Sequence, residues 1–123
     1  MQPLNVVLLQ GDSSVATSLV SELSNSFYSV QLVKSVGEAR TMVAKQRARI
    51  AIIDLEAASI SDVETLSHDF PQTDILCTHR LADETMWAAA LKAGATDFLP
   101  SSDTQNIVRA ARESAVLMRS AAA

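Results

Sequence analysis

The sequence predicts an α/β fold in which five strands alternate with five helices and form one parallel sheet. Two observations predict this fold. Short, nearly continuous apolar runs are typical of strands buried on both faces, and the segments between them repeat apolar residues at helical spacing. Because strand–helix–strand units connect through right-handed crossovers, helices should cover both faces of the sheet and give three layers. We expect a single domain over 1–123, with its core at about 4–119.

Strands are predicted where apolar and β-branched residues run together without a helical gap. The clearest run is "IAIID" at 50–54, which ends on an aspartate. A carboxylate at the end of a buried strand is costly unless another group pairs with it or uses it. The five predicted strands are 4–9, 29–33, 50–54, 74–78 and 96–99.

Each segment between the strands has one apolar stripe at steps of three or four residues, as expected for a helix packed on a sheet. The third segment is the shortest, because Pro71 cannot extend a helix. The five stripes are Val15, Leu19 and Leu23; Val36, Ala39 and Val43; Val63, Leu66 and Phe70; Met86, Ala89, Ala90 and Ala93; and Ile107, Ala110, Ala111, Ser114 and Leu117.

Three helix starts are predicted by the capping-box pattern, a serine followed three residues later by an acid or an amide. Gly94 suits the left-handed conformation that often ends a helix, here the fourth one. The capping pairs are Ser35 with Glu38, Ser61 with Glu64, and Ser102 with Gln105.

The charge balance argues against nucleic-acid binding. The chain carries 14 acidic and 10 basic residues, a net charge of −4, whereas a nucleic-acid surface needs clustered lysine and arginine. One short basic run contains Lys45, Arg47 and Arg49. We interpret it as a helix end, where the helix dipole favours cations.

Several other functional classes find no support in the sequence. No apolar stretch reaches the roughly 18–20 residues of a membrane span, and the N-terminus lacks the basic start of a secretion signal, so we expect a cytoplasmic protein. Cys77 is the only cysteine, and we interpret it as a small buried hydrophobe. His68 and His79 have no partner at metal-ligand or triad spacing, and no nucleophile elbow is present. We therefore expect no enzymatic turnover.

Polar residues collect where the predicted strands end, which is where ligands bind in open parallel sheets. Asp12 follows the first strand, Asp54 ends the third, Thr78 ends the fourth, and Ser101 follows the fifth. We expect these four residues to converge. Asp12 also starts the sequence "DSS" before an apolar stripe, which predicts that it caps the first helix.

Three segments of the chain resemble the receiver domain of bacterial two-component response regulators. "IAIIDL" is similar to the strand whose last aspartate accepts a phosphoryl group, "ILCT" to the strand that ends in a switch hydroxyl, and "LKAGATDFL" to the segment that carries a switch aromatic. The resemblance covers about 4–119 and implies a flavodoxin-like, doubly wound (βα)5 sheet with a role in phosphorelay signal transduction. It implies that Asp54 is the phosphoacceptor, and that Thr78 and Phe98 are the switch residues.

Two departures from the receiver pattern change the expected function. The resemblance implies adjacent acids after the first strand, where this chain has Gln10 and Gly11, and only Asp12 is acidic. It also implies a lysine after the fifth strand, where this chain has Ser101. Phosphoryl transfer depends on cations that neutralise the phosphoryl oxygens. We therefore expect an atypical receiver that acts as a phosphorylation-independent protein-interaction module.

We expect no cofactor and no metal, but two alternatives stay open. Shifting the first-strand alignment by one residue restores one acid, and Mg²⁺ could then bind Asp12, Asp54 and Glu56. The chain would in that case be a functional receiver, phosphorylated on Asp54 by a histidine kinase. The second alternative is a small-ligand or nucleotide site at "GDSSVATS", where a helix N-terminus offers N–H groups, although the Gly-rich phosphate loops are missing.

The expected partners are signalling proteins, either a histidine kinase or an output domain. Trp87 lies about 100° from the apolar stripe of its helix, so we expect it to be partly exposed on an interaction face with Lys92. The alternative is that Trp87 only covers the edge of the core. In receiver domains the fourth helix, fifth strand and fifth helix commonly mediate dimerisation, and the resemblance implies a homodimer through that face.

Overall fold

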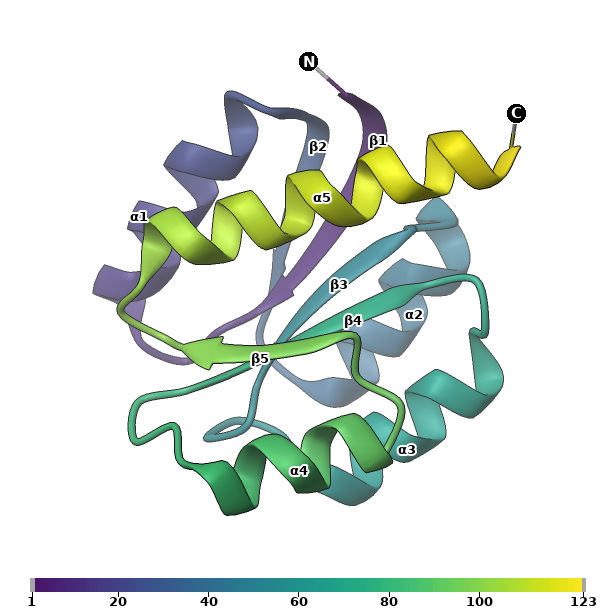
Figure 1. The fold of residues 1–123 in the computed structure, drawn as a ribbon. Coiled ribbons are helices and arrows are strands. Elements are labelled where there is room, and N and C mark those ends of the chain that lie inside the picture. Colours follow the sequence, from purple (N-terminus) through teal and green to yellow (C-terminus); the bar gives the residue numbers. More distant parts are fainter. Residues whose placement is uncertain (1, 123) are drawn as a thin grey trace.

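The computed structural model describes the backbone of residues 2–122 and the side chains of 4–27 and 29–117. Five parallel strands form one sheet in the order β2-β1-β3-β4-β5 (Figure 1). The strands are β1 (Gln2–Leu9), β2 (Phe27–Val33), β3 (Ile50–Asp54), β4 (Asp74–His79) and β5 (Asp97–Pro100), and the helices are α1 (Ser13–Ser24), α2 (Val36–Gln46), α3 (Ile60–Asp69), α4 (Glu84–Lys92) and α5 (Thr104–Ala122). The predicted α/β fold is confirmed.

The helices form one layer on each face of the sheet. Each layer packs on the sheet through its own apolar cluster. The helices α1 and α5 cover one face, and α2, α3 and α4 cover the other (Figure 1). Alternate residues of β3 enter the two clusters, Ile52 beneath α1 and α5, and Ile53 beneath the other three helices. β3 is therefore buried on both faces, which explains its continuous apolar sequence.

The register of the sheet brings the carboxyl ends of the central strands to one edge. Leu9 of β1 pairs with Ile53 of β3, Asp54 pairs with Thr78 of β4, and Thr78 pairs with Leu99 of β5. Whatever follows these strands therefore meets at the same end of the molecule. Within residues 2–122, no helix combines the length and the apolar character needed to cross a membrane.

The start of α2 matches the prediction. The Ser35 Oγ accepts a hydrogen bond from the backbone N–H of Glu38 (3.1 Å). The Glu38 carboxylate accepts in return from the backbone N–H of Lys34 (3.0 Å) rather than from that of Ser35. The reciprocal bond of the predicted capping box is thus displaced by one residue.

Two other predicted helix starts were wrong. α3 is capped by Ser59, which forms a reciprocal capping box with Asp62, and Ser61 lies inside the first turn. α5 is capped by Asp103, whose Oδ1 accepts from a backbone N–H of the first turn (3.3 Å), and not by Ser102. In both segments capping residues follow one another closely, and serine and aspartate cap about equally well. The sequence pattern alone therefore could not select between them.

Two helices end on residues with positive φ. Gly94 follows α4 with a φ of +112°, as its left-handed preference predicted, and a Cβ added there would lie 2.6 Å from the Cβ of Ser67 in α3. Arg47 ends α2 with a φ of +51° and a ψ of +46°, a conformation that glycine or asparagine adopts more readily. No sequence pattern indicates this second case.

The apolar stripe of α5 is shorter than predicted. Ile107, Ala111 and Ala115 form a fully buried row at four-residue steps. Leu117 is 69% exposed, because two residues beyond Ala115 turn the side chain about 200° away from that row.

Candidate functional site

A cavity of about 250 Å³ lies at the carboxyl ends of β1, β3 and β5, where the sequence placed its candidate residues. Asp54, the last residue of β3, is one of the residues that line it. The other polar residues that matter for its chemistry are Gln10, Asp12, Glu56, Arg80 and Ser101. The predicted convergence is confirmed for Asp12, Asp54 and Ser101, whereas Thr78 does not line the cavity but contacts Asp54.

Asp54 is only 3% exposed and has two hydrogen-bond donors. Its Oδ1 accepts from the hydroxyl of Thr78 (2.9 Å), and its Oδ2 accepts from the backbone N–H of Glu56 (3.3 Å). Burial raises the pKa of Asp54 above its ordinary value, and the Thr78 hydroxyl opposes that rise by stabilising the carboxylate. The register pairs Thr78 with Asp54 and so brings the hydroxyl to the carboxylate.

The residues after β1 hold one another rather than a ligand. The Gln10 Oε1 accepts from the backbone N–H of Asp12 (2.9 Å), while its buried Nε2 has no partner among the described residues. The Asp12 Oδ1 accepts from the backbone N–H groups of Ser14 (2.9 Å) and Val15 (3.1 Å). Asp12 is thus the N-cap of α1, as the sequence predicted.

A single ion pair connects the two loops beside the cavity. The Glu56 carboxylate accepts from the backbone N–H of Arg80 (3.1 Å) and lies 3.3 Å from its Nη2. This pair was not predicted from the sequence. Asp54 and Thr78 are paired in the register of β3 and β4, and Glu56 and Arg80 each lie two residues after one of them. The register is therefore the feature that would have indicated this ion pair.

The remaining predicted residues lie around the cavity or away from it. Ser101 is buried at the rim, with its backbone N–H bonded to the carbonyl of His79 (3.1 Å). Phe98 is buried in the core under α2, α3 and α4 and does not reach the cavity. Cys77 is a buried hydrophobe, as predicted, and burial raises the pKa of its thiol to about 12.

The donor set of the cavity does not fit Mg²⁺. In the described part of the chain, no three His, Cys, Asp or Glu side chains lie close enough to hold a metal ion. Each of the three acids named for such a site has another partner: Asp12 caps α1, Glu56 pairs with Arg80, and Asp54 bonds to Thr78. Mg²⁺ requires free oxygen ligands in near-octahedral geometry.

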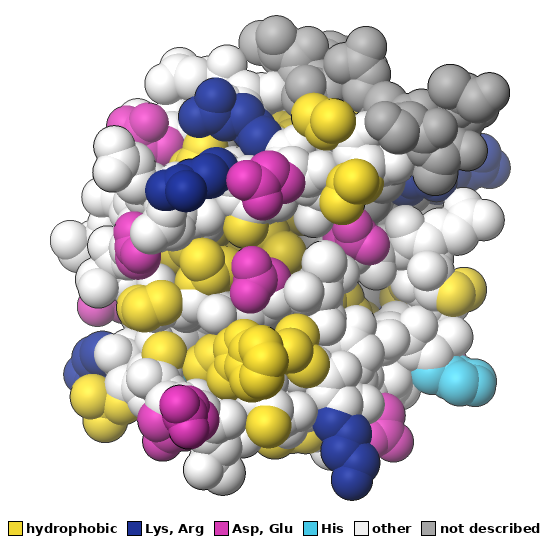
Figure 2. Space-filling view, viewed as in Figure 1, with side chains coloured by type: hydrophobic (Ala, Val, Ile, Leu, Met, Phe, Trp, Pro, Cys, Tyr) yellow, Lys and Arg dark blue, Asp and Glu magenta, His cyan; other side chains and the backbone are white. Residues whose placement is uncertain are grey.

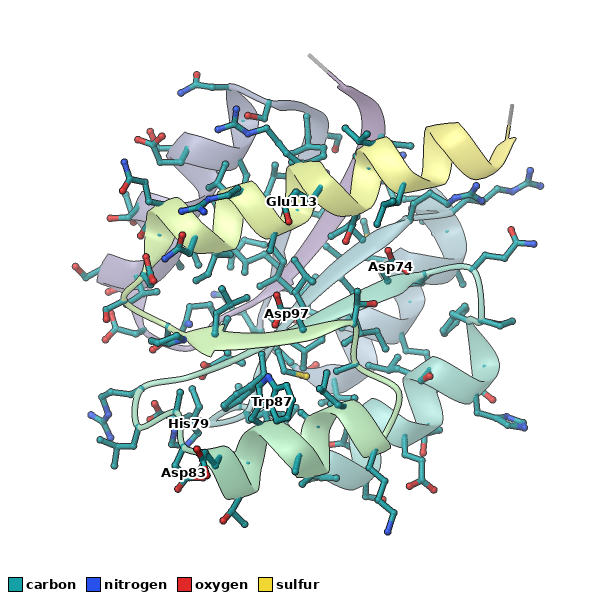
Figure 3. All side chains as sticks on the ribbon, in the orientation of Figure 1. Asp74, His79, Asp83, Trp87, Asp97 and Glu113 are labelled. Atoms are coloured by element: carbon teal, nitrogen blue, oxygen red, sulfur yellow. The ribbon has the colours of Figure 1, made fainter. Side chains whose placement is uncertain are left out.

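Trp87 is 48% exposed, as predicted, and lies on the side of α4 that faces β5 (Figure 3). Figure 2 shows an apolar patch over α4, at the place where Figure 3 labels this side chain. Lys92, at the end of the same helix, is also exposed. Val116 and Leu117 form a second exposed apolar site on α5.

Comparison of the sequence with family models and with curated proteins finds no match. Comparison of the structure finds close matches. A putative response regulator from Chloroflexus aurantiacus is 19% identical over 94% of this chain and 99% of that chain, with a TM-score of 0.82. The chain has the receiver-domain fold. Two further structures are similar to this chain. The receiver domain of the putative response regulator NarL from Mycobacterium tuberculosis is 19% identical over 94% of this chain and 98% of that chain, with a TM-score of 0.82. The receiver domain of the Francisella response regulator 1452 is 13% identical over 94% of this chain and 98% of that chain, with a TM-score of 0.83.

The departures from the receiver pattern that were noted in the sequence lie beside Asp54 in the cavity. The predicted phosphoacceptor position, Asp54, and the predicted switch hydroxyl, Thr78, are in contact. Around them, the positions predicted for the acid pair and the lysine hold Gln10, Gly11 and Ser101, two of which are buried.

Proposed function

We propose that this chain is an atypical receiver domain that binds other signalling proteins without being phosphorylated on Asp54. The observation that carries the proposal is a buried carboxylate in a cavity without a free cation. Arg80 is the only basic residue among the described residues that line the cavity, and it is paired with Glu56.

Electrostatics explains why this arrangement disfavours phosphorylation. A phosphoryl group on Asp54 would bring additional negative charge beside Glu56 and Asp12, and phosphoryl transfer depends on cations that neutralise that charge. A lysine at position 101 would supply one such contact, but serine carries no charge. Each missing charge-assisted hydrogen bond removes about 1.5–3 kcal/mol of stabilisation.

The contacts around Asp54 favour a fixed surface over a switched one. The Thr78 hydroxyl already bonds to the carboxylate, and the Glu56–Arg80 pair joins the loops after β3 and β4. Phe98 is already packed in the core. A histidine kinase, an output domain or a second copy of the chain would then meet one constant arrangement, with Trp87 as an aromatic anchor. The cytoplasmic location and the absence of turnover stay predictions.

Incubation with acetyl phosphate and Mg²⁺, followed by intact-protein mass spectrometry, tests the proposal. We expect no stoichiometric gain of a phosphoryl group by the wild-type chain. The Asp54→Asn variant is the matched control, because it keeps the side-chain shape and removes the acceptor. A gain of one phosphoryl group in the wild type that is lost in Asp54→Asn would overturn the proposal.

That same outcome would support the second candidate, a functional phosphoacceptor receiver. One observation favours it: Asp54 ends β3 and lies against the hydroxyl of Thr78 in a cavity that opens at the strand ends. A nucleotide site is less well supported, since the cavity of about 250 Å³ is smaller than the roughly 300–1,000 Å³ of typical ligand pockets. The carboxylates of Asp12, Asp54 and Glu56 would also repel an anion.

A further inference from the structure

A second hollow lies at the opposite end of the sheet from Asp54, where β3 and β4 begin. Its volume is about 590 Å³. One wall is the end of α2 with the loop that leads into β3, and the other is the segment from the end of α3 to β4 (Figure 1). We call it the basal hollow, and it includes part of the basic run noted in the sequence.

The basal hollow carries unbalanced positive charge. Arg47 and Arg49 both line it, and Asp69 is the only acid among the described lining residues. The Asp69 Oδ2 lies 2.6 Å from Nη1 of Arg40, and its Oδ1 lies 3.2 Å from Nδ1 of His68. These partners hold the pKa of Asp69 below its ordinary value. Asp69 is thus already paired, and the two lining arginines have no carboxylate partner among the side chains that the structure describes.

Arg49 has an unused donor. Its Nη1 donates to the Oε1 of Gln72 (3.1 Å), but its Nε is buried and has no partner among the described residues. Buried N–H groups almost always have an acceptor, because leaving one without a bond is costly. An incoming oxygen acceptor would satisfy this group. Since only the bond to Gln72 would break, the guanidinium can turn toward the hollow when such an acceptor arrives.

The basic run lies at the end of α2, as interpreted from the sequence, but Arg49 lies beyond the helix in the loop before β3. Lys45 is the basic residue in the last turn of α2. The carbonyl of Val43 near that end already accepts from the backbone N–H groups of Arg47 and Ala48. The carbonyl of Gln46 accepts from the side-chain amide of Asn5. Two carbonyls at the end of α2 therefore have partners other than Arg49.

Apolar side chains form the rest of the basal hollow. Val43 and Ala48 contribute from the α2 side, and Phe70 and Pro71 contribute from the α3 side. The guanidinium of Arg40 lies 5.7 Å from the centre of the Phe70 ring and covers it. A binding partner would need one anionic group for the arginines beside an apolar group for these walls.

We propose that the basal hollow binds an acidic segment of a partner protein, with a carboxylate held by Arg49 and Arg47 and a neighbouring apolar side chain on Phe70 and Pro71. We choose an acidic occupant because the arginines of the hollow are positively charged. The planar guanidinium group also matches a carboxylate, with which it forms two parallel hydrogen bonds. The site lies at the far end of β3 from Asp54, so this proposal stands independently of the one on phosphorylation.

An NMR titration of the ¹⁵N-labelled chain with acetyl-Gly-Leu-Glu-Leu-Gly-amide tests the proposal. We expect saturable shifts confined to residues 43–49 and 69–73, with an affinity of about 1 mM, and a shift of the Nε–H signal of Arg49. The peptide with glutamine in place of glutamate should bind at least about tenfold more weakly. Absence of saturable shifts up to about 10 mM, or equal binding of the two peptides, would overturn the proposal.

Three variants separate binding from folding. Arg49→Lys keeps the charge but removes the fork, and should weaken binding severalfold. Arg47→Gly removes the second guanidinium and also relieves the left-handed backbone at this position, so binding should fall while the melting temperature does not. Lys45→Gln removes a nearby exposed charge outside the hollow and should leave binding unchanged. Lys45→Gln and Arg47→Gly each remove one positive charge, so equal effects of these two variants would reduce the interaction to general charge attraction and refute the site.

Discussion

Replacing Thr78 with valine removes one hydroxyl from the phosphoacceptor-like site and keeps the shape of the side chain. The hydroxyl donates to the buried Asp54 carboxylate over 2.9 Å. A hydrogen bond to a charged group contributes about 1.5–3 kcal/mol, and one between neutral groups about 0.5–1.5 kcal/mol. At neutral pH we expect Thr78→Val to lower the free energy of unfolding by about 1.5–3 kcal/mol, a large part of the roughly 5–15 kcal/mol that stabilises a typical domain.

This loss should depend on pH in a defined direction. The Thr78 hydroxyl lowers the pKa of Asp54 against the larger, opposite effect of burial. Its extra stabilisation therefore belongs to the ionised carboxylate, is complete above the folded-state pKa, and declines as the pH falls through it. At low pH, the difference in the free energy of unfolding between wild type and Thr78→Val should therefore shrink to the contribution of a hydrogen bond between neutral groups.

Urea unfolding of both proteins, from neutral pH downward, measures these differences directly. Thr78→Ser is the matched control, because it keeps the hydroxyl and removes only a methyl group. Its loss should not change with pH. If Thr78→Val costs less than about 0.5 kcal/mol at neutral pH, or the same amount at every pH, the hydroxyl does not stabilise the Asp54 carboxylate and our reasoning about the site fails.

Three further substitutions test other parts of the structure. Asp54→Asn should raise the free energy of unfolding at neutral pH, because burial raises the pKa of Asp54 and so disfavours its ionised form. In urea titrations this gain in stability should vanish as the pH falls toward 3.8, and a gain that stays constant with pH would contradict this cause. Gly94→Ala should destabilise by about 2–5 kcal/mol, through the strained positive φ and the crowding against Ser67; recovery of part of the loss in the double variant with Ser67→Gly checks the second cause. Ser59→Ala should cost about 1 kcal/mol, whereas Ser61→Ala should change stability by less than about 0.5 kcal/mol; equal losses would show that the cap is misassigned.

Much of the fold was predictable because its signals are local. β3 lies at the predicted residues, Ile50–Asp54, because a strand buried on both faces must be continuously apolar. The starts of α3 and α5 were less predictable. Several residues with capping side chains follow one another there, and the choice between them depends on how the preceding loop leaves the sheet.

The candidate site, like the fold, could be predicted only in part from the sequence. The convergence of Asp12, Asp54 and Ser101 follows from a parallel sheet, whose carboxyl ends share one edge. The pair between Glu56 and Arg80 did not follow, because it requires the register between β3 and β4 as well as the strands themselves.

β3 lies at the centre of the sheet and is covered on both sides. Its two tips reach different regions of the surface, the Asp54 cavity at one end and the basal hollow at the other. The long axis of this one strand therefore separates the two cavities, and a peptide bound in the basal hollow, as proposed, would leave the surroundings of Asp54 uncovered.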